Sequence, residues 1–268
     1  MYQLNPLPFA KKFTSFVASL LLLLATACQP AATGEVETTT EEVTEEEVAA
    51  PADSTETTAA EASTSLDADL VTRLASMESY AAKCDGAETD LAVPVMEIAK
   101  NLEAQKLEYI HEKLQDCSGM FHQVLMKLKD RCPDHAYPEV DKYRDSRALA
   151  QWYHENEKLI LVTDEKAKSS LIKPGAAMFY GYSGKDYSSF TADDLFVRGT
   201  GINHVGIVVD VKKDESGQVT NYSIFHGRNP KHTAGITSYH NLVPTRESYP
   251  PLGNGGGKWV AIAPAIWD

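Results

Sequence analysis

A cysteine and a histidine occupy positions from which their side chains could exchange one proton. Cys117 lies in the run 116–119 (Asp-Cys-Ser-Gly), at the expected start of a helix, and His204 opens an apolar, β-branched run. A thiol is a good nucleophile as thiolate, and a helix N-terminus and a neighbouring imidazole both lower its pKa. The pair therefore predicts a nucleophilic cysteine with a lowered pKa and a histidine base, which is the chemistry of a cysteine hydrolase.

The elements that must hold these residues change in character along the chain. Apolar spacing predicts helices over 66–83, from about Pro94 onward, and from Cys117 or Ser118 to about Lys129, and Ser146 is expected to cap a fourth. Strands are expected at 159–162, 176–182, 204–211, 219–226 and 259–263. Helices followed by an antiparallel meander indicate an α+β domain in which the cysteine helix packs against the sheet.

A turn expected at 214–217 would make a hairpin of the strands at 204–211 and 219–226. His204 and His226 would then lie side by side, and His226 could hold the His204 imidazole in one tautomer, as the third member of a triad does. Asp116 adds a negative charge beside the thiol, so we expect it to be a structural residue or a contact for a substrate amine.

Four short motifs follow one another between residues 107 and 228. They are Asp-Cys-Ser-Gly at 116–119, Leu-Ile-Lys-Pro-Gly at 171–175 leading into Met-Phe-Tyr at 178–180, His-Val-Gly-Ile-Val at 204–208, and Ile-Phe-His at 224–226. Their order resembles the NlpC-like family of papain-fold cell-wall cysteine peptidases. The resemblance implies a papain-like domain over 107–268, preceded by an N-terminal helical segment over 66–106.

The same resemblance implies Cys117 as the nucleophile, His204 as the general base and His226 as the residue that orients the base. The implied substrate is the stem peptide of peptidoglycan, cut next to a D-γ-glutamyl residue. The family has a tyrosine upstream of the cysteine, and Tyr109 is the candidate here for a phenol near the oxyanion. Ser118 joins Asp116 and Tyr109 as a candidate substrate-binding residue.

The chain also departs from the family pattern. A Gly-Gly pair upstream of the cysteine is missing, and Ala176 stands where the family usually has an aspartate. A long insertion over 180–201 and a longer hairpin over 212–220 would reshape the substrate groove. The glycine-rich run 253–257 has no helix behind it and no Lys-Ser/Thr pair, so we expect a flexible connection and not a phosphate cradle.

The first residues have the pattern of a lipoprotein signal. Lys11 and Lys12 precede an apolar run at 13–24, and Ala-Thr-Ala at 25–27 precedes Cys28. The small residues before Cys28 resemble a bacterial lipobox, which implies removal of 1–27 and a lipid on the Cys28 thiol. An ordinary secretory signal is the alternative. Since Gln29 is not an aspartate, the outer membrane is favoured, at its periplasmic face or at the cell surface.

Residues 28–65 are expected to form a disordered acidic tether. Positions 29–65 hold ten acidic residues and no lysine or arginine, too polar a composition to offset the chain entropy of folding. Of the net charge of −13, residues 1–28 contribute +2 and residues 29–65 contribute −10, which leaves −5 for 66–268. No basic patch predicts nucleic-acid binding. The expected partners are peptidoglycan stem peptides and the membrane, and the oligomeric state stays open.

The four cysteines divide by role. With Cys28 assigned to the lipid and Cys117 to chemistry, Cys84 and Cys132 remain, and the cell envelope permits a disulfide between them. Two free buried thiols are the alternative. No metal or other cofactor is expected, because His122 has no partner at ligand spacing.

Three functions compete on this evidence. The first is a lipid-anchored peptidoglycan endopeptidase. The second is an amidase or acyltransferase of the same fold that acts on another amide or ester. The third is a catalytically inactive, envelope-binding lipoprotein, against which the intact Cys117, His204 and His226 argue.

Overall fold

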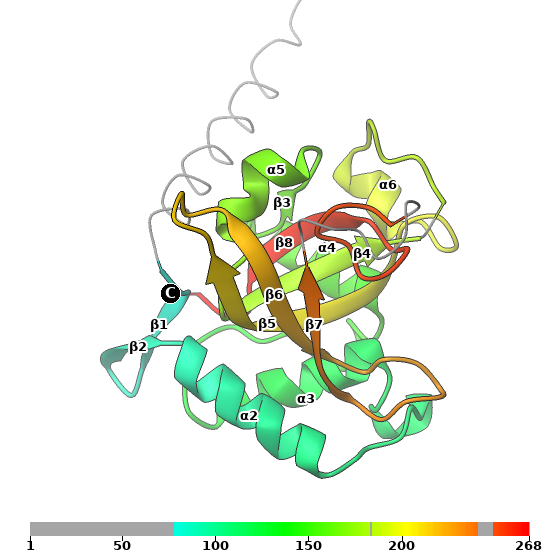
Figure 1. The fold of residues 1–268 in the computed structure, drawn as a ribbon. Coiled ribbons are helices and arrows are strands. Elements are labelled where there is room, and N and C mark those ends of the chain that lie inside the picture. Colours follow the sequence, from blue (N-terminus) through cyan, green and yellow to red (C-terminus); the bar gives the residue numbers. More distant parts are fainter. Residues whose placement is uncertain (1–77, 183, 241–248, 268) are drawn as a thin grey trace, which may run out of the picture. The chain divides into compact units, whose positions relative to one another are not determined.

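The computed structural model describes residues 78–182, 184–240 and 249–267. They have an α+β fold with two antiparallel sheets, a hairpin β1-β2 and a six-stranded sheet of order β3-β8-β4-β5-β6-β7 (Figure 1). The strands are β1 Ala81–Cys84, β2 Ala87–Asp90, β3 Ile160–Leu161, β4 Ala176–Gly181, β5 Ile202–Lys213, β6 Val219–His226, β7 Gly235–His240 and β8 Trp259–Pro264. The helices are α2 Ala92–Ala104, α3 Cys117–Lys129, α4 Ser146–Glu155, α5 Glu165–Lys168 and α6 Ala192–Phe196, with 3-10 turns at His111–Lys113 and Ser169–Leu171.

The expected α+β class is confirmed, and so is the hairpin. Strand β5 pairs antiparallel with β6, with Ile207 opposite Phe225. Gly217, at φ +82°, takes the left-handed conformation that the connecting turn needs. Strands β4 and β8 are buried along their whole length, which makes the centre of the sheet the core of the domain.

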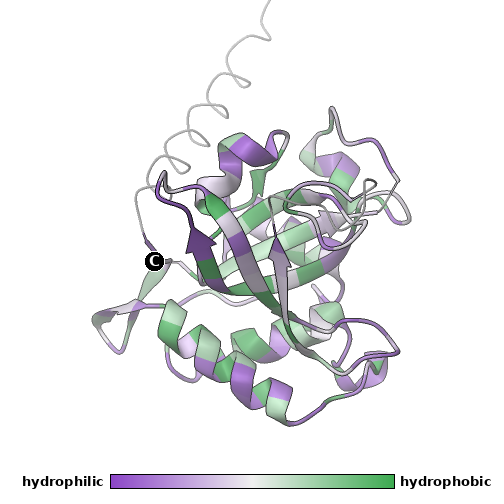
Figure 2. Ribbon diagram, viewed as in Figure 1, coloured by the Kyte–Doolittle hydropathy of each residue, from purple (hydrophilic) through white to green (hydrophobic). Residues whose placement is uncertain are grey.

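Helices α2 and α3 pack against each other and against strands β5, β6 and β7 (Figure 1). Val95, Ile98 and Leu102 form the buried face of α2, and α3 buries Val124 and Leu128. Burial of each such side chain contributes roughly 1.5–3 kcal/mol to the stability of the fold. Figure 2 shows hydrophobic residues along the strands and on parts of these helices, while the tip of the β5-β6 hairpin is hydrophilic.

The predicted helix over 66–83 is wrong where the structure describes it. Ala81–Cys84 is strand β1, which pairs with β2 across a turn whose residues Asp85 and Gly86 have positive φ. The Asp-Gly pair is a hairpin signal, and it outweighs the helical spacing of the residues before it. Residues 66–77 lie outside the described part of the chain, as do the signal sequence, Cys28 and the tether.

The second helix starts at Ala92, two residues before Pro94, and ends at Ala104. Tyr109, Ile110 and Leu114 are therefore not on it, and Leu114 has a left-handed backbone at φ +55°. The described part of the segment 66–106 thus contains a hairpin and one helix, and that helix packs on the same sheet as α3. Among the described residues, no helix has the length and hydrophobicity to cross a bilayer.

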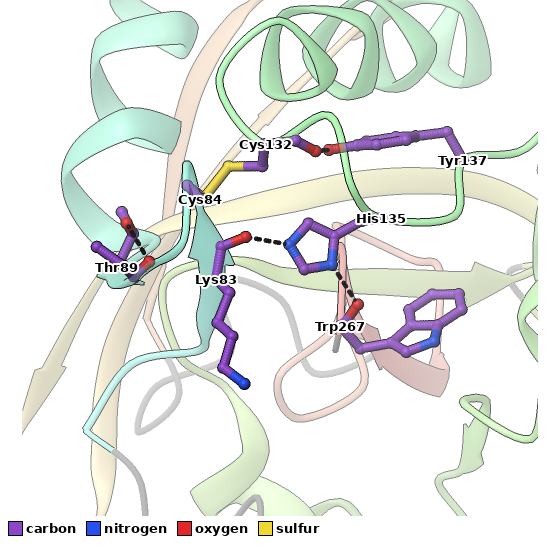
Figure 3. The surroundings of a disulfide bond; sticks show 8 residues. Lys83, Cys84, Thr89, Cys132, His135, Tyr137 and Trp267 are labelled. Carbon is purple, nitrogen blue, oxygen red and sulfur yellow. Dashed lines mark hydrogen bonds between the residues drawn. A yellow bond between two sulfur atoms is a disulfide. The ribbon is translucent and has the colours of Figure 1, made fainter.

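A disulfide joins Cys84 at the end of β1 to Cys132 after α3 (Figure 3). His135 strengthens the same junction, because its Nε2 lies 2.7 Å from the Lys83 carbonyl oxygen and its Nδ1 lies 2.5 Å from that of Trp267. The β1-β2 hairpin, the segment after α3 and the end of the chain are therefore tied together at one place.

Loss of this disulfide should lower stability without touching the thiol of Cys117. The bond closes a loop with a sequence separation of 48. On the chain-entropy account such a closure stabilises by about 4 kcal/mol. We expect the double variant Cys84→Ala/Cys132→Ala to unfold at a clearly lower denaturant midpoint than the oxidised protein. An unchanged midpoint, or peptide mapping that finds both thiols free, would contradict the expectation.

Candidate active site

The candidate nucleophile stands at the first residue of α3. Asp116 precedes it with an extended backbone, and its carboxylate accepts a hydrogen bond of 2.7 Å from the Gly119 amide. This N-cap leaves other amides of the first turn free to face an anion beside the sulfur. Cys117 itself is 7% exposed. Of the three cysteines that the structure describes, Cys117 is the one outside the disulfide.

Two glycines let the backbone close around this helix start. A Cβ on Gly119 would lie 2.4 Å from the Leu114 carbonyl carbon. A Cβ on Gly227, directly after β6, would lie 2.5 Å from the Asp116 carbonyl oxygen. Any larger residue at Gly227 would push the end of β6 away from the Asp116–Cys117 peptide, and His226 with it.

The two histidines meet across the β5-β6 hairpin. His204 Nε2 lies 2.7 Å from His226 Nδ1, and the rings are edge-on with centroids 4.9 Å apart. Gly206, two residues after His204 on β5, makes room on the same side: a Cβ there would lie 2.9 Å from Ile224 Cδ1 and 3.3 Å from the His226 Cβ. The structure thus brings His204 and His226 into the contact that the sequence predicts.

The sulfur of Cys117 lies next to the start of β5. Its thiol lies 3.9 Å from the carbonyl oxygen of Asn203, the residue before His204, and 4.0 Å from the Tyr109 hydroxyl. Within the described part of the chain, no hydrogen bond joins Cys117 Sγ to the His204 ring. Since Nε2 of His204 faces His226, Nδ1 is the nitrogen left for the thiol. Catalytic contacts of this kind are often long without substrate and shorten in the complex.

Ser146 is a residue of the site that the sequence did not assign to it. Its hydroxyl lies 3.5 Å from Cys117 Sγ. The expectation that Ser146 caps α4 is wrong, because the Asp145 carboxylate caps that helix through the amides of Arg147 and Ala148. With the neighbouring Asp145 able to cap, Ser146 becomes the first helical residue and its hydroxyl is available to the sulfur.

The buried carboxylate of Asp116 is held in a hydrogen-bond network. Arg144 donates to both of its carboxylate oxygens at 3.1 Å, and His111 Nδ1 bonds to Oδ2. Burial alone would raise the pKa of Asp116, but Arg144, the Gly119 amide and His111 together lower it. The Ser118 hydroxyl lies 2.9 Å from Arg144 Nη1 within the same network. This arrangement favours the structural role for Asp116; the substrate contacts of Asp116, Ser118 and Tyr109 stay predictions.

Burial sets the protonation states of Cys117, His204 and His226. It raises the pKa of the Cys117 thiol more than the hydrogen bond from Ser146 lowers it. The charge of Asp116 raises the pKa further, and the hydrogen bond from Tyr109 has a smaller lowering effect. The expected lowered pKa of the thiol is therefore wrong for this structure. Burial lowers the pKa of His204 to about 4 and holds that of His226 well below its usual range. The resting site thus contains a neutral thiol and two neutral imidazoles.

These protonation states predict an unusual pH profile. His204 must be neutral to accept a proton, and with a pKa of about 4 it stays neutral down to that pH. We expect kcat/KM to fall only below about pH 4.5, whereas a histidine of ordinary pKa, near 6.5, would lose activity below about pH 6.5. Alkylation of Cys117 by iodoacetamide should accelerate only at pH values above the pKa of an ordinary thiol. A kcat/KM profile with an acid limb near pH 6.5 would contradict this prediction.

A groove begins at His204. A cavity of about 270 Å³ is lined by His204, Asn203, Tyr180, Tyr182, Asn254, Gly256 and Gly257. A second, of about 410 Å³, shares Tyr182 and Gly256 with it and is lined also by Lys185 of the 180–201 insertion and by Lys258, directly after the glycine-rich run. Residues of the insertion and of the glycine-rich loop therefore line the groove. The insertion was expected to shape a groove, whereas the sequence of the glycine-rich loop did not indicate such a place.

The glycine-rich loop is anchored to the sheet. The Tyr222 hydroxyl of β6 donates to the carbonyl oxygens of Leu252 and Gly253, at 2.8 and 2.9 Å. The Tyr239 hydroxyl of β7 donates to the Asn254 side-chain oxygen. The expectation of a flexible connection did not foresee these two contacts, which come from tyrosines distant in sequence. Within the described ranges, no group of three acidic, histidine or cysteine side chains could hold a metal ion.

Comparisons of this chain with protein-family models, with curated proteins and with solved structures return no match.

Proposed function

We propose that this protein is a cysteine hydrolase of the cell envelope, with a papain-like fold, that cleaves peptidoglycan stem peptides next to a D-γ-glutamyl residue. One observation carries the catalytic part of the proposal. A cysteine at a helix N-terminus lies beside the start of the strand that bears His204, and His204 Nε2 lies 2.7 Å from His226 Nδ1. The substrate part rests on the sequence motifs that surround these three residues.

The reaction follows from the protonation states. His204 takes the Cys117 proton at Nδ1 as the sulfur attacks the amide carbonyl, so that a neutral pair becomes an imidazolium and a thiol-linked oxyanion. Amides at the start of α3 and the Tyr109 hydroxyl, 4.0 Å from the sulfur, would stabilise that oxyanion. The imidazolium then protonates the leaving amine, and the C–N bond breaks to give a thioester. Water, deprotonated by His204, hydrolyses the thioester and restores the thiol.

The groove gives the substrate a direction. The leaving amine must lie next to His204, because that imidazole protonates it. The cavity that His204 lines would therefore receive the amine side of the cut bond. Its lining includes two tyrosines, two asparagines and two glycines, a set that suits a polar peptide more than an apolar one.

Digestion of purified peptidoglycan by the full chain tests the proposal. Mass spectrometry of the released fragments should find stem peptides cut after the D-γ-glutamyl residue, and these fragments should be absent with Cys117→Ala. Fragments cut at another amide would support the amidase alternative of the same fold. The absence of any released fragment, together with an inert thiol, would favour the inactive binding protein.

The anchor can be tested separately from catalysis. Cys28→Ser removes the thiol that would carry the lipid, and with it the hydrophobic attachment. We expect the variant to move from the membrane fraction to the soluble envelope fraction, with hydrolysis of soluble muropeptides unchanged. If the variant stays with membranes, the attachment lies elsewhere in the chain.

A further inference from the structure

Two hydroxyls and a carbonyl oxygen lie around the sulfur of Cys117. The Ser146 hydroxyl lies 3.5 Å from Sγ, the Asn203 carbonyl oxygen 3.9 Å and the Tyr109 hydroxyl 4.0 Å. A carbonyl oxygen only accepts hydrogen bonds, whereas a hydroxyl both donates and accepts them. Asn203 can therefore bond only to a sulfur that carries its proton, while the two hydroxyls can also bond to a sulfur that has lost it.

Ionisation of the thiol changes which of these contacts are favourable. The neutral S–H can donate to the carbonyl oxygen of Asn203. A thiolate has no proton to donate, so the negative end of that carbonyl then faces a negative sulfur. The Ser146 and Tyr109 hydroxyls can each donate to the thiolate, and hydrogen bonds to an ionised partner are about twice as strong as neutral ones. This pair of hydroxyls therefore favours the ionised sulfur.

We propose that Ser146 is a catalytic residue, which donates a hydrogen bond to the ionised sulfur of Cys117 and so allows a buried thiol to react. The inference rests on the proposed function for the two steps in which it acts. In the first, the thiol proton moves to His204 and the sulfur becomes negative. In the second, the C–S bond of the thioester breaks, and the sulfur leaves with the bonding electrons before it takes a proton from the His204 imidazolium. Ser146 keeps its own proton throughout, and Tyr109 assists from a greater distance.

The burial of both side chains makes this donor important. Cys117 is 7% exposed and Ser146 is 5% exposed. Because solvent is largely excluded there, a charge on the sulfur depends on donors that the protein supplies. Burial has the largest effect on the pKa of the thiol and raises it, and the hydrogen bond from Ser146 has the next largest and lowers it. The charge of Asp116 raises the same pKa, and the hydrogen bond from Tyr109 lowers it to a smaller extent.

The residues before Ser146 hold its backbone next to the sulfur. The Asp145 carboxylate caps α4, and Ser146 is the first residue of that helix. Arg144 donates to both carboxylate oxygens of Asp116 at 3.1 Å, and to the carbonyl oxygen of His111 at 2.6 Å. Asp116 directly precedes the cysteine, and His111 follows Tyr109 by two residues. Arg144 thus ties the start of α4 to the two segments that bear the other groups at the sulfur.

The pH dependence of Cys117 alkylation by iodoacetamide tests the proposal without any substrate. The full chain is treated in detergent, and the peptide that contains Cys117 is quantified by mass spectrometry. Loss of the donor in Ser146→Ala should move the midpoint of the rate profile to higher pH. At roughly pH 8 we expect alkylation to be about 10-fold slower than in the wild type. Tyr109→Phe should move the midpoint in the same direction by less, because its hydroxyl is farther from the sulfur.

The shape of the profile separates ionisation from access to the sulfur. A variant that only changes access alters the rate by one factor at every pH and leaves the midpoint unchanged. An unchanged or lower midpoint in Ser146→Ala would therefore overturn the inference, whatever happens to the rate itself.

Ser223→Ala is the matched control. It also removes a buried serine hydroxyl, but that hydroxyl lies on β6 and bonds to the Ser238 hydroxyl at 2.7 Å. We expect its midpoint to equal that of the wild type. If Ser223→Ala moves the midpoint as far as Ser146→Ala does, the inference is wrong.

Kinetics on a stem peptide separate this inference from the proposed function. If the function is correct, Ser146→Ala should lower kcat about 10-fold with KM unchanged. A higher thiol midpoint in Ser146→Ala, in a protein that hydrolyses no stem peptide, would support the inference and count against the proposed function. Hydrolysis by the wild type, with the midpoint unchanged in Ser146→Ala, would support the function and overturn the inference.

Discussion

Replacing Cys117 with alanine should abolish hydrolysis while leaving the protein folded. Without the sulfur there is no covalent intermediate, and residues that act as one catalytic unit lose nearly all their effect together. We expect the rate to fall roughly 10⁴-fold or more. The Asp116 network that caps α3 does not use the sulfur, so the helix should keep its start. Turnover of purified peptidoglycan or of a stem peptide measures the loss.

Met126→Ala is the matched control for this variant. Met126 is on the same helix and is 44% exposed, so its truncation tests for non-specific damage to α3. We expect activity and melting temperature close to those of the wild type. Appreciable hydrolysis by Cys117→Ala would rule out a cysteine nucleophile at this position.

Loss of His204 should cost far more than a conservative change of His226. His204→Ala removes the proposed base for the thiol proton, and general acid–base catalysis of this kind contributes roughly 10²–10⁴-fold. His226→Asn keeps a polar group beside His204 Nε2, and an amide can orient an imidazole without acting as a base. We expect a loss of roughly 10-fold, the scale of residues that orient a functional histidine.

Steady-state kinetics of both variants on one stem-peptide substrate decide the matter. Equal and nearly complete losses would mean that His226 takes part in proton transfer itself. No loss in His226→Ala would mean that another residue orients the base. His240 is a poor substitute, because it pairs with Asn221 five residues along β6 from His226 and hydrogen-bonds that side chain.

Local sequence determined the cysteine helix and the β5-β6 hairpin, the elements that hold the candidate catalytic residues. The cysteine helix begins at Cys117, and β6 covers Val219–His226. Both follow from short-range signals, a helical apolar stripe after residue 117 and a turn between two β-branched runs. The contact of His204 with His226 could be predicted for the same reason, since a tight hairpin turn fixes which residues meet.

Tertiary structure decided what surrounds these residues. Ser146, Gly227, Thr237 and Asn254 reach the site from elements distant in sequence, and no local pattern distinguishes such residues from ordinary surface positions. The protonation states also depend on tertiary structure. A helix start by itself predicts a lowered thiol pKa, but packing buries the Cys117 sulfur and raises that pKa. The spacing of apolar residues along the chain predicts which face of a helix or strand a residue occupies. Its desolvation and its long-range hydrogen bonds depend on which other elements pack against that face.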